Sequence, residues 1–249
     1  MKKTCLVLLL LSLILLSGCL SAQNKTDGKV HYTLGISYLR EPNYALALKE
    51  FYLAAEANPN DPNIHLSMGQ TYQLLQSYDD AEKSYKKALR LSDVSFEPIC
   101  QNNLGALYLD MKRWDDAILY FTKATKSLLF LNPDVANAGI GYAYFSKGDF
   151  LSAISFYKKS LASNPGYATA HMRLAEAYEA FGKPDLALKE YQDVVKMAPE
   201  NAVVQYQYGL SSAKLGKKNQ AVQAFREVIR IAPESEEARM ALDNIKLLQ

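Results

Sequence analysis

One spacing pattern runs through almost the whole chain after residue 27 and limits what it can fold into. A small residue is followed twelve positions later by alanine, and four positions after that by an aromatic residue, six times in phase. The small residues are Gly35, Gly69, Gly105, Gly141, Ala175 and Gly209. The alanines are Ala47, Ala81, Ala117, Ala153, Ala187 and Ala221. The aromatic residues are Phe51, Tyr85, Phe121, Tyr157, Tyr191 and Phe225. Successive small residues lie 34, 36, 36, 34 and 34 positions apart, which indicates an array of repeated supersecondary units.

Each unit is predicted to contain two helices. In the stretch from Pro98 to Leu131, two apolar stripes at helical spacing are separated by a short polar break at Lys112 and Arg113. Neither helix can bury its stripe alone, so each needs a neighbour. Small residues lie where two helices must approach closely, and aromatic residues fill the remaining space. Proline, which interrupts helices, closes four of the six units at Pro59, Pro165, Pro199 and Pro233.

This pattern resembles the tetratricopeptide repeat (TPR) family of 34-residue helix–turn–helix units. The resemblance implies an all-α fold, a right-handed superhelical TPR solenoid of six repeats with a C-terminal capping helix. The TPR domain is expected over 28–249, with repeats at 28–61, 62–97, 98–133, 134–167, 168–201 and 202–235. The segment 236–249 has one apolar face, as expected of a cap that covers the last repeat.

The first residues read as an export signal. Lys2 and Lys3 precede an apolar run from Leu6 to Leu16, which is shorter than the ~20 residues of a membrane span. The following sequence, Leu16-Ser17-Gly18-Cys19, resembles a bacterial lipobox. It implies a lipoprotein signal peptide over 1–18, a covalent lipid such as palmitate on Cys19, and a short tether over 19–27. The alternative is an ordinary secretory signal with a chance cysteine. Leu20 in place of aspartate resembles the sorting signal for the outer membrane, facing the periplasm.

Charge and cysteine content narrow the function classes. The formal net charge is +2, and removal of the two leader lysines leaves +2 − 2 = 0, so no nucleic-acid partner is expected. Cys5 would leave with the leader and Cys19 would carry lipid. Cys100 then has no intramolecular disulfide partner. We expect it to be a small apolar filler on a helix, with a reactive thiol as the alternative.

The histidines give no catalytic pattern. His31, His65 and His171 all lie four residues before the small residue of a first helix, a position that Gln101, Asn137 and Gln205 fill in the other repeats. The alternative is that the three histidines bind metal ions or act as an acid–base set. An ordinary repeat position explains the three histidines more simply. The sequence has no HExxH pair, cysteine cluster or phosphate-binding glycine loop. We expect no enzyme activity, no metal, no small-molecule substrate, and no cofactor besides the lipid on Cys19.

The candidate binding site comes from the TPR resemblance, which implies that first helices line a concave groove. Ligand contacts are expected from residues three before, one after and four after the small residue. The candidates are Tyr32, Ile36, Leu39, Leu66, Gln70, Gln73, Asn102, Ala106, Leu109, Ala138, Tyr142, Phe145, Met172, Glu176, Glu179, Tyr206, Leu210 and Ala213. This mostly apolar and aromatic set suits an apolar or amphipathic peptide or helix. The alternative is that about half of these side chains only pack within the array.

Two repeats are longer than 34 residues and carry apolar residues where a loop is usually polar. These are Val94 and Phe96 in the second repeat, and Leu128, Leu129, Phe130 and Leu131 in the third. We favour an extended second helix that packs its extra turn on the next repeat. An exposed partner-binding element is the alternative.

The lipobox, the short tether, the six repeats and the total length together resemble the PilF/PilW family of pilotin lipoproteins. These assist the secretin of type IV pilus biogenesis in reaching the outer membrane and assembling there. The resemblance is most detailed from Asn102 to Leu161, and the longer second repeat departs from it. It implies a membrane-anchored scaffold for protein–protein interaction whose partner is a secretin or another pilus-assembly component. The alternatives are an adaptor for polysaccharide export or outer-membrane protein assembly, or a regulator of a periplasmic hydrolase.

Overall fold

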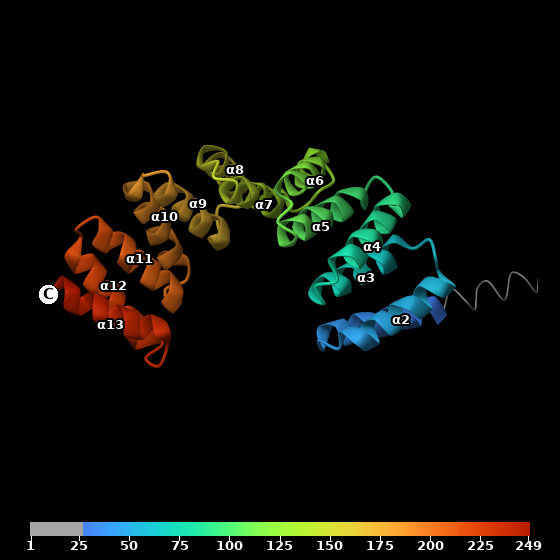
Figure 1. The fold of residues 1–249 in the computed structure, drawn as a ribbon, viewed down its shortest axis with the longest axis horizontal. Coiled ribbons are helices and arrows are strands. Elements are labelled where there is room, and N and C mark those ends of the chain that lie inside the picture. Colours follow the sequence, from blue (N-terminus) through green and yellow to red (C-terminus); the bar gives the residue numbers. More distant parts are fainter. Residues whose placement is uncertain (1–26) are drawn as a thin grey trace, which may run out of the picture. The chain divides into compact units, whose positions relative to one another are not determined.

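A computed structural model describes residues 27–249, which form helices joined by short turns and contain no strand (Figure 1). Residues 27–40 are helical. The helices that follow are α2 (Tyr44–Ala57), α3 (Pro62–Leu74), α4 (Tyr78–Leu91), α5 (Glu97–Asp110), α6 (Trp114–Lys126), α7 (Pro133–Ser146), α8 (Phe150–Ser163), α9 (Ala168–Ala180), α10 (Pro184–Met197), α11 (Ala202–Lys214), α12 (Lys218–Ile231) and α13 (Glu236–Leu248).

The expected all-α arrangement of paired helices is confirmed. Helix pairs α3–α4, α7–α8, α9–α10 and α11–α12 pack against each other, and each second helix also packs on the first helix of the following pair. Three-residue turns make the partners antiparallel. The segment 236–249 contains α13, which packs on α12 and α11.

The chain divides into two compact units. The first ends at Met111 and contains, among the described residues, the helix at 27–40 and α2 to α5. The second runs from Lys112 to Gln249 and contains α6 to α13. The division falls in the turn between the two helices of the third repeat.

The small residue and the aromatic residue of a repeat touch each other. A Cβ atom added at Gly35 would lie 2.5 Å from the Phe51 ring, and one at Gly141 would lie 2.7 Å from the Tyr157 ring. Gly69 with Tyr85 and Gly209 with Phe225 repeat this arrangement. The aromatic rings at these four sites are buried, and the alanine four residues before each ring is fully buried. Glycine therefore provides the space for the ring that holds the two helices together.

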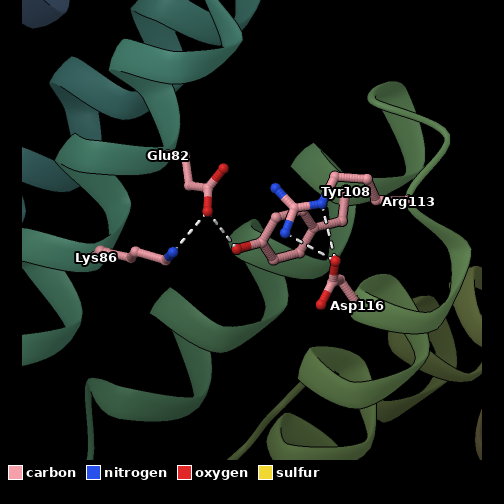
Figure 2. Close-up of polar contacts among 5 residues, drawn as sticks. All are labelled: Glu82, Lys86, Tyr108, Arg113 and Asp116. Atoms are coloured by element: carbon pink, nitrogen blue, oxygen red, sulfur yellow. Dashed lines mark hydrogen bonds and ion pairs between the residues drawn. The ribbon is translucent and has the colours of Figure 1, made fainter.

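The repeated tyrosine, three residues after the small residue, contacts the preceding repeat. Figure 2 shows the Tyr108 hydroxyl, from α5, donating to the Glu82 carboxylate of α4 at 2.8 Å, while Lys86 donates to the same oxygen at 2.6 Å. In α3, the Tyr72 hydroxyl lies 2.5 Å from that of Tyr52 in α2. Both bonds link a second helix to the first helix of the following repeat. In the second unit, Figure 2 also shows Arg113 paired with Asp116 across the first turn of α6 at 2.8 Å.

The turn between paired helices has a left-handed residue seven positions after the small residue. Gly148, Gly182 and Gly216 have φ of 79°, 75° and 70°. The same position takes φ of 59° at Gln76 and 56° at Lys112, where a side chain makes this conformation costly. Three of the repeats thus use glycine where the tight turn requires it.

The expectation of extended second helices in the long repeats is wrong. Helix α4 ends at Leu91 and α6 ends at Lys126, so the extra residues form turns. Val94 is 74% exposed, and Leu128 and Leu131 are almost fully exposed. In the second repeat, the Asp93 carboxylate accepts hydrogen bonds from the backbone of Ser95 and Phe96, which favours a turn over another helical turn.

The contact between glycine and the aromatic ring can be tested with Gly141→Ala. The added methyl group would displace the Tyr157 ring, and overpacking of this kind costs ~1–3 kcal/mol, partly offset by the higher helix propensity of alanine. We expect a lower melting temperature by circular dichroism. Gly166→Ala is the matched control, because its Cβ would meet only Asn164, at an ordinary 3.7 Å. Equal stability of the two variants would contradict this account.

Candidate functional site

Side chains from three successive first helices meet in the first unit. Leu39, Gln70 and Gln73, all candidates from the sequence, line a pocket of about 420 Å³. Ala106, from the third helix of this set, lines it as well. The remaining lining residues are Leu74, Tyr85, Asn103 and Asp110. The expected positions therefore do come together on the surface of the first helices.

The polar groups of this pocket are already ordered by one another. The Gln73 side-chain amide donates to Asp110 at 2.6 Å, and its carbonyl accepts from the Tyr85 hydroxyl at 2.8 Å. Burial raises the pKa of Tyr85, so its hydroxyl remains a donor. The ring of the same tyrosine packs against Gly69, so one residue serves both the core and the pocket.

Sequence reasoning missed several residues of this pocket. Asn103 accepts from Gln70 at 3.4 Å and lies two residues before the small glycine. Leu74 and Asp110 each lie five residues after the small glycine of their own repeat. These positions border the expected ones on the same helix face, since neighbours three and four apart share a face. Asn103, Leu74 and Asp110 each follow an expected position by one residue, so a wider set of groove positions would have included all three.

Other candidates of the first unit are turned toward the core. Tyr32 and Ile36 pack against the cluster around Phe51, with 5.9 Å between the rings of Tyr32 and Phe51. Leu66 is 9% exposed. Leu109 is half-buried. The Asn102 side chain is also half-buried, and its carbonyl oxygen has no hydrogen-bond partner among the described residues.

Tyr142 is the centre of the candidate surface in the second unit. The Trp114 ring meets it edge-on, with centroids 6.1 Å apart, and the Arg173 guanidinium lies 5.2 Å from its centroid. Arg173 also donates to Glu176 at 2.8 Å. These side chains come from α6, α7 and α9. Aromatic and arginine side chains are the types that most often dominate protein–protein binding energy.

The pocket beside α9 and α11 contains two more candidates. Met172 and Glu176 line it together with Arg173, Val203 and Val204. Glu179, also on α9, is half-buried. This pocket combines an apolar floor with one ion pair.

The other candidates in the second unit mainly pack against neighbouring side chains. The Phe145 ring packs against the Phe150 ring at a tilt of 57°, with 5.5 Å between centroids, and Ala138 is 8% exposed. Tyr206, Leu210 and Ala213 pack against the cluster that α13 completes, so the capping helix covers part of the surface of α11. About half of the sequence candidates thus contribute to packing, as the simpler interpretation expected.

The loop expected as an alternative contact is exposed in part. Leu128, Leu129 and Leu131 are 101%, 54% and 89% exposed, whereas Phe130 is 9% exposed. The candidate Phe130 therefore faces inward, with exposed residues on both sides of it in the turn over 127–132.

In three repeats the histidine position ties the first helix to the loop before it. His65 and His171 bond to the carbonyl oxygens of Pro59 and Pro165, at 2.9 and 3.1 Å, through the Nε2 atom. In the last repeat, the Gln205 amide donates to Pro199 at 3.0 Å. Histidine and glutamine therefore serve the same role in these three repeats, whereas Gln101 donates to Glu97 of its own helix. No group of three metal-ligating side chains occurs within residues 27–249.

Cys100 is fully buried, and burial raises the pKa of its thiol to about 12. The thiolate, which is the reactive form, is thus scarce at neutral pH. This burial favours the expected packing role over a reactive thiol.

The predicted signal peptide, Cys19 and most of the tether lie outside the described residues. Within residues 27–249, helices that combine the length and the apolar character of a membrane span are absent.

Family models described as tetratricopeptide repeat match residues 60–128, 144–206 and 204–235. Among solved structures, the type IV pilus biogenesis factor PilW has a TM-score of 0.77 and 24% identity over 86% of this chain and 98% of its own. PilF of Pseudomonas aeruginosa has a TM-score of 0.74 and 18% identity over 89% of this chain and 99% of its own.

Curated relatives show the same repeats in proteins of different roles. The type IV pilus assembly protein PilF of Pseudomonas aeruginosa is 24% identical over 65% of this chain and 67% of its own length. Anaphase-promoting complex subunit 3 of Schizosaccharomyces pombe is 25% identical over 67% of this chain. The chain spans only 24% of that protein, and 21% of the human protein O-mannosyl-transferase TMTC3.

The role of His65 predicts a pH effect on stability. Burial lowers the pKa of His65 below its ordinary 6.5, so the unfolded chain binds this proton more readily and stability falls as the pH drops below 6.5. His65→Gln keeps a donor for the Pro59 carbonyl, as Gln205 does for Pro199. The variant should lose less stability than the native chain on acidification, because glutamine binds no proton in this range. Parallel pH dependences in thermal denaturation would contradict this role.

Proposed function

Because the chain is a tetratricopeptide repeat protein, we propose that it is a non-enzymatic, membrane-anchored scaffold that binds a protein partner through the surface of its first helices. We further propose that it assists the assembly or stability of a type IV pilus secretin in the outer membrane. It requires no cofactor besides a lipid on Cys19. The match to the PilW and PilF structures carries this proposal, because it extends over nearly all of both chains.

The extent of this match separates the pilus proteins from the first two curated relatives. The chain spans only 24% and 21% of the first two curated proteins, which share the repeat but contain much more chain. It spans 67% of PilF by sequence and 99% of PilF by structure. Arrays of such repeats form extended surfaces that bind other proteins.

The chemistry of the two candidate surfaces favours a peptide or helix with apolar anchors. In the second unit, Tyr142 lies between Trp114 and Arg173, which leaves an aromatic face bordered by one guanidinium. In the first unit, Gln70 and Asn103 provide amide groups that can bond to a peptide backbone. The second unit thus offers aromatic anchors and the first unit offers amides, and each surface is formed within its own unit.

The partner surface is tested by Tyr142→Ala in a capture experiment from solubilised membranes. Removal of a central aromatic anchor is expected to reduce recovery of the secretin about tenfold or more, with the helical circular dichroism unchanged. Phe181→Ala, an aromatic residue 39% exposed next to the end of α9, is the control and should leave capture unchanged. Capture without any secretin or pilus component, from the native chain, would sink the pilus assignment. Equal capture by Tyr142→Ala would sink the assignment of this surface.

The anchor is tested by metabolic labelling with palmitate. Cys19→Ser should abolish incorporation of the label, because the cysteine sulfur is the site of attachment, whereas Cys100→Ser should retain it. An amount of label in Cys19→Ser equal to that of the native chain would show that the lipobox interpretation is wrong.

A further inference from the structure

The turn between α6 and α7 holds three leucine side chains in solvent. Leu128 and Leu131 are almost fully exposed, and Leu129 is half-exposed. The first turn of α7 adds Val135, which is 41% exposed. Aliphatic side chains this exposed are rarely gathered on one turn without a function.

The turn is held in this conformation by its own contacts. Phe130 is buried and anchors the turn to the unit, and its backbone N–H donates to the Ser127 carbonyl at 3.2 Å. The Ser127 hydroxyl accepts from the Leu129 N–H at 3.3 Å. Phe130 thus keeps the leucines directed outward instead of allowing them to collapse onto the helices.

Lysines lie on the helix ends nearest these leucines. Helix α6 has Asp115 and Asp116 in its first turn but Lys123 and Lys126 in its last turn, beside the exposed turn. The neighbouring α8 has Lys158 and Lys159 in its C-terminal half. An Asn164–Asp134 hydrogen bond of 2.8 Å holds the end of α8 beside the start of α7, so all four lysines are on the helix halves nearest the turn.

The opposite ends of α6, α7 and α8 carry both signs of charge. Lys147, after α7, pairs with Asp115 at the start of α6, and Asp149 caps α8 through the Ser152 N–H. The exposed leucines and the four lysines therefore lie at the same end of these three helices, together with Asp134 in the first turn of α7.

We propose that the turn over 127–132 contacts an anionic phospholipid surface, with the leucines of the turn inserted among the acyl chains and the lysines at the headgroups. Apolar side chains rimmed by lysines are the pattern that binds such surfaces. A protein partner would be expected to meet exposed aromatic residues here, whereas leucine is under-represented among the residues that dominate protein interfaces. In this turn the aromatic residue is buried and the leucines are exposed.

This inference rests on the membrane attachment in the proposed function, because a few leucines and lysines alone bind a bilayer only weakly and reversibly. Together with a lipid on Cys19, the turn would provide a second contact and restrict the orientation of the second unit at the membrane.

The test uses the full chain, purified with its lipid and reconstituted into vesicles of phosphatidylethanolamine with a minority of phosphatidylglycerol. Leu131→Trp places a fluorescent reporter on the turn, and Leu151→Trp places one at a residue 62% exposed in the first turn of α8, at the opposite end of these helices. The native Trp114 is subtracted using the unsubstituted chain. Flotation of the vesicles reports anchoring, and quenching by brominated acyl chains reports insertion of the reporter.

We expect severalfold stronger quenching of the tryptophan at position 131 than at position 151, and a loss of that difference in pure phosphatidylcholine vesicles or with Lys123→Gln and Lys126→Gln. Flotation without quenching at position 131 would overturn the inference and leave the anchor intact. Failure to float would overturn the anchor, and the inference with it. Quenching that requires added membrane proteins would replace lipid by protein as the ligand and also overturn the inference.

Discussion

The contact between a small residue of the first helix and an aromatic ring of the second is the interaction on which the repeats depend. At Gly35, Gly69, Gly141 and Gly209 the ring occupies the space that a Cβ atom would need. The fully buried alanine one helical turn before each ring lets the backbones approach. Burial of these rings supplies much of the stabilisation of each pair, at ~1.5–3 kcal/mol for a large apolar side chain. Tyr85 shows how a binding surface grows from this contact, since its hydroxyl positions Gln73 in the first-unit pocket.

Features that follow from this contact could be predicted from the sequence. The constant spacing of this contact predicted the helix pairs and the all-α class. The expectation that His65 and His171 occupy an ordinary repeat position agrees with their bonds to proline carbonyls. The contacts of Tyr108 and Tyr72 with the preceding repeat could not be predicted from the spacing, since their partners differ between Glu82 and Tyr52.

The surface was less predictable because exposure depends on neighbouring helices. Tyr206 and Leu210 occupy the same repeat positions as Tyr32 and Tyr142, yet α13 covers part of their surface. The turn over 127–132 was expected to be helical because its residues are apolar, and hydrophobicity alone does not separate a packed helical turn from an exposed one. Asn103 and Asp110 were missed because the expected stripe of groove residues was drawn too narrow.

The central claim is that a protein of the pilus-assembly machinery binds the aromatic surface around Tyr142. Photo-crosslinking in the living cell tests it most directly, with a photoreactive amino acid at position 142 or at Leu119, an exposed position on the second helix α6. The account predicts a crosslink to a secretin or another pilus component from position 142 and none from position 119. Crosslinks from position 119 alone, or from position 142 to proteins unrelated to the pilus, would contradict it.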